Sequence, residues 1–422
     1  MKEPSGQMKG VEPLEAEDYS WDDLTPLHGI IHKDSHKFLK FSNDTTVDHL
    51  LPMWKKNIDD NHKNGMWKIH GSLITACSML GKNKAIIGVG AGRSFKNNAD
   101  TLKFIHDNDA VKNWEDRDFI IFASNHQFKP LLKMGIIPDF VYLVDASGMP
   151  SVHKQLCEGI PREGKDVVLI APFNVSPNIA TPWTKQGRKM LFFVSNQKEL
   201  LAHACDVIGE DLKDHAIVCG GNVLNTMWMF SSKIFGSTVF LGMGNDLSFP
   251  IKKTKKEQEK GYYCDGDYST NAPVTGSGRD EAACEKKWLG FKIKKRNIFV
   301  PNKNNLEIVG ADILGTSHSL WVYKTWIEES MLLVTHYYKY LGLHYYNCTE
   351  GGILGVMAKS LKDEDLKKNE NWYMLDEVCS RWHTTTLEHA ATQFLKAKEG
   401  AKCQGLEILA DVQAVRELVL QN

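Results

Sequence analysis

The stretch Lys84-Ala-Ile-Ile-Gly-Val-Gly-Ala-Gly-Arg-Ser-Phe95 decides the fold, because an apolar strand runs into a Gly-rich turn and then into a helix. Glycines let backbone N–H groups approach an anion closely, and the following helix directs its positive end at it. The stretch predicts a site for a nucleotide or another phosphorylated ligand. A tight turn with close helix packing is the alternative explanation for the same glycines.

The Gly-rich turn departs from two well-known phosphate motifs. Gly88, Gly90 and Gly92 alternate, and Arg93 stands where the dinucleotide fingerprint G-x-G-x-x-G has its third glycine. The second strand runs into Ser124-Asn125-His126, without the acid that binds ribose in dinucleotide enzymes. No G-x-x-x-x-G-K-[ST] motif occurs in the chain. NAD, FAD and P-loop chemistry are therefore not expected.

The composition is that of a soluble globular protein. The chain has 422 residues, 42% of them hydrophobic and 24% charged, with a formal net charge of −1, which gives no overall attraction to nucleic acid or membrane. Its nine cysteines form no CxxC pair, which favours reduced thiols over a disulfide framework. Residues 1–20 are polar and acidic, and no apolar run reaches the length of a membrane span. We expect a cytoplasmic protein.

Short apolar runs alternate with segments long enough for crossover helices. Continuous apolar runs, unlike alternating ones, are typical of strands buried on both faces. The pattern predicts an α/β fold, a Rossmann-like, doubly wound and mostly parallel sheet with helical N- and C-terminal additions. The expected strands lie at residues 84–89, 118–123, 139–144, 166–171, 190–194 and 237–243.

Three regions are expected along the chain. Residues 1–80 read as a helical lead-in, and 81–355 as a Rossmann-like nucleotide-binding core that contains a polar insertion at about 251–313. Residues 356–422 read as a C-terminal helical region. Apolar and aromatic residues return at helical spacing from Leu314 to Leu341 and are expected to be core.

Small polar residues follow each expected strand, and ligands of open α/β sheets bind outside the carboxyl ends of the strands. Asn, Asp and Ser are also the usual helix caps, so part of this set has only that role. Two later motifs repeat the Gly-rich pattern, Cys219-Gly-Gly-Asn-Val-Leu-Asn225 and Asn347-Cys-Thr-Glu-Gly-Gly352. The candidate nucleotide-binding residues are Gly90, Gly92, Arg93, Ser94, Asn125, Gly220, Gly221, Asn222, Thr349, Gly351 and Gly352.

Three acids are candidates for catalysis. Asp145 and Asp246 follow strands, where aspartates often bind Mg²⁺ that bridges to phosphate, so Mg²⁺ is a possible cofactor. Glu350 can act as a general base, bind a sugar hydroxyl, or cap a helix. No spacing typical of zinc sites occurs.

Taken in order, these motifs resemble one family. The series Val89 to Phe95, Lys129-Pro-Leu-Leu-Lys-Met-Gly-Ile-Ile-Pro-Asp139 with Val144-Asp145, Gly220-Gly-Asn-Val, Gly242 to Leu247 and Thr349-Glu-Gly-Gly352 is similar to the Maf (motility-associated factor) flagellin glycosyltransferases and the related archaeal 6-hydroxymethylpterin diphosphokinases. The resemblance covers roughly residues 80 to 355. Arg93 and Phe95 replace the proline and leucine of the family's turn, and the chain is shorter than typical Maf proteins.

The resemblance implies a Rossmann-like core and a nucleotide site. Gly90, Gly92, Ser94, Asn125, Asp145, Gly221, Asn222 and Asp246 would line that site, with Glu350 beside the glycosyl group. It implies a glycosyltransferase whose donor is a nucleotide sugar, a CMP-linked nonulosonic acid being favoured, and whose acceptor is a hydroxyl group, of a protein Ser or Thr or of a small molecule. The alternatives are a Mg²⁺-dependent pyrophosphokinase that uses ATP and a hydroxymethylpterin-like acceptor, and a non-catalytic nucleotide-binding relative.

Overall fold

A computed structural model gives the fold of most of the predicted core. It describes residues 49–92, 94–217, 222–247, 249–250, 291–292, 314–316, 323–324, 326–327, 343–352, 354 and 382–403.

The described strands form one nine-stranded sheet in the order β12-β11-β7-β1-β2-β3-β4-β5-β6, with parallel pairing throughout. The chain lays down β1 to β6 in one direction and then returns to place β7 on the free side of β1. This order confirms the predicted α/β, doubly wound fold. The strands are β1 Ala85–Val89, β2 Phe119–Ser124, β3 Phe140–Tyr142, β4 Val168–Pro172, β5 Met190–Ser195, β6 Ala216–Ile217, β7 Val239–Met243, β11 His344–Asn347 and β12 Trp382–Thr384.

Helices connect the strands and cover both faces of the sheet. Residues 49–63 are also helical, and they lie in the region expected to be a helical lead-in. Short 3-10 turns precede β2, β4 and β6, at η2 Trp114–Asp116, η3 Arg162–Asp166 and η4 Lys213–His215. The named α-helices are α3 Met66–His70, α4 Leu73–Cys77, α5 Phe95–Asp109, α6 Asn125–Lys133, α7 Pro150–Leu156, α8 Pro177–Lys185, α9 Lys198–Ile208, α10 Val223–Lys233 and α16 Leu387–Cys403.

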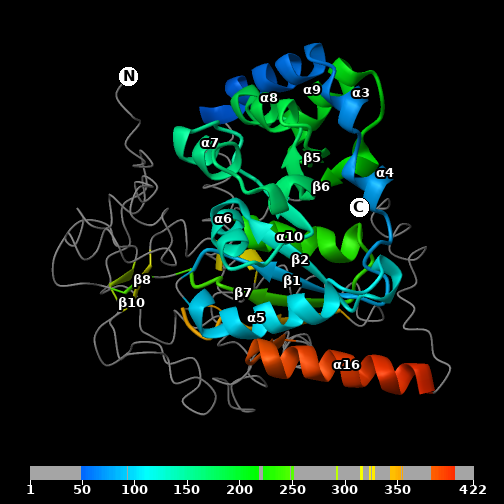
Figure 1. Cartoon of the computed structure of the whole chain (residues 1–422). Coiled ribbons are helices and arrows are strands. Elements are labelled where there is room, and N and C mark those ends of the chain that lie inside the picture. Colours follow the sequence, from blue (N-terminus) through cyan, green and yellow to red (C-terminus); the bar gives the residue numbers. More distant parts are fainter. Residues whose placement is uncertain are drawn as a thin grey trace, which may run out of the picture.

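Alternate residues of the central strand feed two separate cores. Ile86 of β1 packs in the cluster that contains Trp228 of α10, whereas Ile87 packs in the cluster that contains Phe95 of α5 and Phe394 of α16. Figure 1 shows α10 on one side of β1 and β7, with α5 and then α16 on the other. Both faces of β1 are thus covered, which is why its five residues are all buried and read as a continuous apolar run.

Several elements were not predicted by the sequence. β12 lies in the region that was expected to be helical, and it extends the sheet beyond β11. Leu314–Thr316, expected at helical spacing, is instead strand β10, which pairs antiparallel with β8 (Phe249–Pro250) and β9 (Phe291–Lys292). Strands of two or three residues are too short to show a period, so they depend on partners distant in sequence. The remaining positions of the expected insertion, 251–290 and 293–313, and positions 356–381 and 404–422 lie outside the described residues.

The N-terminal helix, residues 49–63, is fixed to the loop after β4 by a buried amide. Asn61 is fully buried, and its Nδ2 donates to Phe173 O and Val175 O, both at 2.8 Å. We expect Asn61→Leu to lower the free energy of unfolding by ~3 kcal/mol, because the variant leaves two buried carbonyls without a donor. Urea unfolding measures this loss. Asn64→Leu, at an exposed position of the turn that follows, is the control, and equal stability of the two variants would contradict the expectation.

Candidate functional site

The Gly-rich turn after β1 packs directly on the loop after β7, at the point where the strand order reverses. Gly90 N–H donates to Met243 O and Gly92 N–H donates to Gly244 O, both at 2.8 Å. A Cβ at Gly90 would lie 2.3 Å from Gly244 O, so only glycine allows this backbone approach. Close packing therefore explains the glycine at position 90, and the N–H groups of Gly90 and Gly92 are engaged within the protein.

Asp246 links the loop after β7 to the start of α5. Its Oδ2 accepts from Ser94 N–H at 3.1 Å, and its Oδ1 accepts from the Ser94 hydroxyl. A Cβ at Gly92 would lie 2.3 Å from Asp246 Oδ1, which explains the second glycine of the turn. Both carboxylate oxygens of Asp246 thus hold the N-terminus of α5, where the helix dipole favours negative charge.

The loop after β11 completes the same cluster. Thr349 Oγ1 accepts from Asn245 N–H at 3.3 Å. Gly352 has a φ of 73°, and a Cβ there would lie 2.1 Å from Asp246 O, while a Cβ at Gly351 would lie 3.1 Å from Ser94 Cβ. Three loops, each following a different strand, therefore meet at this edge. We call them the switch-point cluster, which consists of Gly90, Gly92, Ser94, Gly244, Asn245, Asp246, Thr349, Gly351 and Gly352.

Asn222 begins α10 and joins it to this cluster. Its Oδ1 accepts from Asn225 N–H at 2.8 Å, which is a helix cap, and its Nδ2 donates to Asn245 Oδ1 at 3.3 Å. The predicted nucleotide-binding residues of the first, second and third Gly-rich motifs thus come together, as far as the structure describes them. Arg93, Gly220 and Gly221 lie outside the described residues.

Glu350 lies near the start of α16. Burial raises the pKa of its carboxyl group, and Asn98 and the Leu387 N–H oppose that shift. The Leu387 N–H itself donates to Asn98 Oδ1 at 3.0 Å. The Glu350 backbone is held at a φ of 52°. Helix capping and a role beside a glycosyl group both stay predictions for this residue.

A second polar group lies at the carboxyl ends of β2 and β3. Asn125 Nδ2 donates to Gln155 Oε1 at 2.7 Å, and Gln155 Nε2 lies 2.9 Å from His126 Nδ1. Because Gln155 Oε1 accepts the hydrogen bond from Asn125, Gln155 Nε2 is the donor to His126 Nδ1. The neutral His126 ring therefore carries its proton on Nε2.

Asp145 lies at the solvent edge of this group. It is exposed, and its Oδ1 accepts from Ser147 N–H at 2.8 Å, which closes a turn after β3. Burial lowers the pKa of His126 to about 4, although the Asp145 carboxylate opposes the shift. A neutral imidazole and an exposed carboxylate thus lie in the same part of the site.

Tyr323, which the sequence analysis expected to be core, packs against the core cluster that contains Trp228. Its backbone oxygen accepts from Asn225 Nδ2 at 2.7 Å. Burial raises the pKa of its phenol, and Asp145 adds to the shift. No local pattern distinguishes this tyrosine from the core aromatics around it. Asn125, His126, Asp145 and Gln155 are called the Asp145 group below.

The low pKa of His126 gives the stability of the protein a defined pH dependence. The unfolded ring titrates near 6.5 and the folded ring at about 4, so the unfolded chain binds more protons between these values. The contribution of neutral His126 to the free energy of unfolding is therefore fully present above pH 6.5, and it is lost as the pH falls from 6.5 to 4. We expect His126→Gln to reduce the slope of unfolding free energy against pH by up to ~1.4 kcal/mol per unit. Urea unfolding at pH 7, 6 and 5 checks this, with the exposed His62→Gln as control. An unchanged slope in His126→Gln would contradict it.

The described residues place limits on a metal site. No cluster of three or more His, Cys, Asp or Glu side chains suited to a metal ion occurs among them. Mg²⁺ in phosphate chemistry needs only one or two carboxylates besides phosphate and water. Asp145 fits that use better than Asp246, whose two oxygens hold Ser94. Within the same described residues, no helix has the length and apolar character that crossing a bilayer demands.

Comparison with known proteins is consistent with the motif series. Residues 55–252 match the model of the family described as 6-hydroxymethylpterin diphosphokinase MptE-like. The solved structure of the Maf glycosyltransferase from Magnetospirillum magneticum AMB-1 matches with a TM-score of 0.40 and 15% identity, over 71% of this chain and 37% of that one. This chain thus covers well under half the length of that enzyme. No curated protein matches the chain. The model of the MptE-like family thus matches residues 55–252, which confirms the resemblance to this family predicted from the motifs.

Proposed function

We propose that the protein is a transferase that takes a glycosyl group from a nucleotide sugar and passes it to a hydroxyl group. The observation that carries this proposal is the place of Thr349, Gly351 and Gly352. They lie beyond the segment that matches the diphosphokinase family, yet they pack into the switch-point cluster against Ser94 and Asp246. The site thus has an additional wall that the matched segment alone would lack, in keeping with a donor larger than a nucleoside phosphate. A CMP-linked nonulosonic acid is the favoured donor, from the motif resemblance.

Asp145 is the best candidate for the general base. Its carboxylate is exposed at the carboxyl edge of the sheet, and Ser147 N–H fixes its orientation. In the proposed reaction the acceptor oxygen bonds to the anomeric carbon as the bond from that carbon to the phosphate oxygen breaks. The hydroxyl proton goes to Asp145, and the nucleotide leaves with the bonding electrons.

His126 has a supporting role in this proposal. Gln155 holds its Nδ1 as an acceptor and burial keeps the ring neutral, so the ring adds no positive charge that would weaken Asp145 as a base. A Mg²⁺ ion held by the donor phosphate and water would supply charge for the leaving group, which leaves the Asp145 carboxylate available as the base.

Pyrophosphoryl transfer is the second candidate. It is favoured by the family match, because residues 55–252 include both Asp145 and Asp246, the two acids that follow β3 and β7. In that reaction ATP with Mg²⁺ would be the donor and a hydroxymethyl group the acceptor. The acceptor hydroxyl would again lose its proton to a carboxylate.

A thermal-shift panel separates the candidates. The ligands are CMP, CDP, UDP, GDP and ATP, each with and without Mg²⁺, because a ligand at about 100 times its dissociation constant stabilises by roughly 2.7 kcal/mol. We expect CMP or CDP to raise the melting temperature selectively. Stabilisation by ATP only in the presence of Mg²⁺ would favour pyrophosphoryl transfer over glycosyl transfer. A melting temperature that none of the nucleotides raises would favour a non-catalytic relative.

A further inference from the structure

A pocket of about 690 Å³ lies at the amino ends of β2 to β5, on the opposite edge of the sheet from the switch-point cluster and the Asp145 group. Its walls come from α4, the end of α5, η2 and the first residues of the strands. The volume is within the usual range of small-molecule sites. No element of the proposed transferase reaction reaches this edge, so the pocket needs an explanation of its own.

The walls of the pocket are mainly apolar. Trp114, which is partly exposed, faces the same space as Phe119 and Phe140, the first residues of β2 and β3. Aromatic and aliphatic walls of this kind bind the apolar part of a ligand by excluding water. The aliphatic residues of the lining include Leu80, Ile105, Ile137, Val168 and Leu191.

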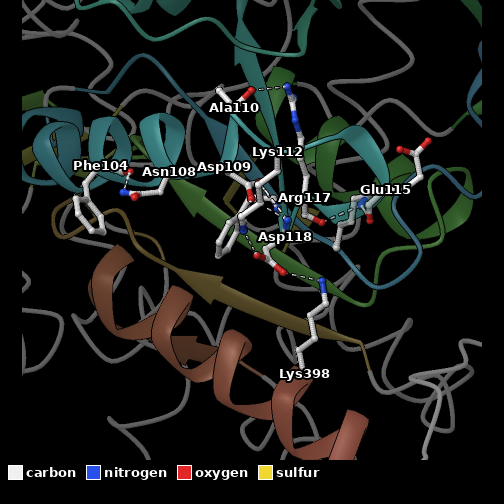
Figure 2. Close-up of polar contacts among 11 residues, drawn as sticks. Phe104, Asn108, Asp109, Ala110, Lys112, Glu115, Arg117, Asp118 and Lys398 are labelled. Carbon is white, nitrogen blue, oxygen red and sulfur yellow. Dashed lines mark hydrogen bonds and ion pairs between the residues drawn. The ribbon is translucent and has the colours of Figure 1, made fainter.

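The negative charges of two carboxylates in the pocket wall are already balanced by ion pairs and hydrogen bonds within the protein. Asp139 accepts from Arg117 Nη1 at 2.7 Å and from Ile121 N–H at 2.8 Å. Asp109 accepts from two backbone N–H groups and forms an ion pair with Lys112 at 2.9 Å. Figure 2 shows Asp109, Lys112, Arg117 and Asp118 near the start of β2. The third lining acid, Asp166, is exposed to solvent.

One cation, Lys189, and one N–H group of Arg117, whose charge Asp139 already compensates, remain available to a ligand. Lys189 lines the pocket, is exposed, and forms no ion pair within the described residues. Arg117 Nε is buried without a hydrogen-bond partner in the same part of the structure. The charge of Lys189 acts on the pocket wall, because it opposes the effect of burial that raises the pKa of the Cys77 thiol to about 12. An anion at this end of the pocket would therefore be stabilised.

We propose that this pocket binds a small amphiphilic anion, an apolar ring system or short chain that carries one carboxylate, sulfonate or phosphate group. The apolar part lies against Trp114, Phe119 and Phe140, and the acidic group lies at Lys189. The site is separate from the transferase site and does not depend on the reaction proposed there.

Titration of the full-length protein with 1-anilinonaphthalene-8-sulfonate tests the proposal, since this fluorophore has an apolar ring system and one sulfonate. We expect one site per chain. Ala76→Trp places an indole at an exposed lining position and is expected to weaken binding at least tenfold, whereas Thr75→Trp, an exposed neighbour that does not line the pocket, leaves it unchanged. Lys189→Gln is expected to weaken binding about fivefold, the upper range of one exposed charge pair, with Lys185→Gln as the matched control.

The uncharged probe N-phenyl-1-naphthylamine isolates the role of charge. We expect its affinity to fall in Ala76→Trp and to stay constant in Lys189→Gln. Equal losses of both probes in Lys189→Gln would overturn the anion assignment. Binding that Ala76→Trp leaves intact, or several weak sites per chain, would overturn the pocket itself. Circular dichroism of each variant confirms that folding is retained before binding is compared.

Discussion

Replacing Gly90 by alanine is expected to destabilise the protein by ~3 kcal/mol and to disorder the switch-point cluster. The new Cβ would lie 2.3 Å from Gly244 O and 2.9 Å from Gly244 C, both backbone atoms. Backbone cannot move aside as a flexible side chain can, so the loops after β1 and β7 must separate. Their separation would break the Gly90 N–H to Met243 O bond and shift Asp246 from Ser94.

Gly400→Ala is the matched control for this substitution. Gly400 lies in α16, its Cβ would meet nothing within 4 Å, and alanine there is expected to stabilise by ~0.5–1 kcal/mol through helix propensity. Urea unfolding of both variants measures the difference. If Gly90→Ala were as stable as the parent, the close approach of the two loops would be refuted, and the glycine would need another explanation.

Replacing Asp145 by asparagine is expected to reduce turnover by a factor of about 10² to 10⁴ with little change in stability, within ~0.5 kcal/mol. The amide oxygen can still accept from Ser147 N–H, so the turn after β3 is kept while the proton acceptor is lost. The assay uses the donor class selected by the thermal-shift panel. Thermal unfolding of the variant checks that the fold is intact.

Asp100→Asn provides the control for Asp145→Asn. Asp100 is an exposed acid on α5, so its replacement removes one negative charge from the surface without touching the Asp145 group. Turnover is expected to stay at the parent level. Equal activity of the parent and Asp145→Asn would exclude Asp145 as the base, and loss of activity in both variants would indicate a general charge effect.

Most of the parallel sheet could be predicted from the sequence, because a strand that is buried on both faces is a continuous run of apolar residues. β1, β2, β5 and β7 are continuous apolar runs, and the structure places them near the predicted positions. β6 and β12 have two and three residues and are too short to form a recognisable apolar run. Their positions depend on pairing with β5 and β11, which a local pattern does not encode.

The candidate site could also be predicted only in part. The Gly-rich motifs predict the turns, and the fold brings these turns together at one edge of the sheet. What each glycine contacts could not be predicted, because the contact of Gly92 is Asp246, a residue of another loop. His126 and Gln155 are ordinary polar residues of helices α6 and α7 whose pairing depends on the packing of those helices.

The switch-point cluster also orders events during synthesis of the chain. β1 to β6 are laid down in sequence, so this half of the sheet can form while β1 still has an unpaired edge. That edge is covered only when β7 emerges, and the cluster is complete only after Gly352 has been made. Until then the growing chain has an unpaired strand edge that is open to unwanted pairing, and the switch-point cluster is incomplete. Formation of the switch-point cluster therefore requires that both halves of the chain have been made and have packed together.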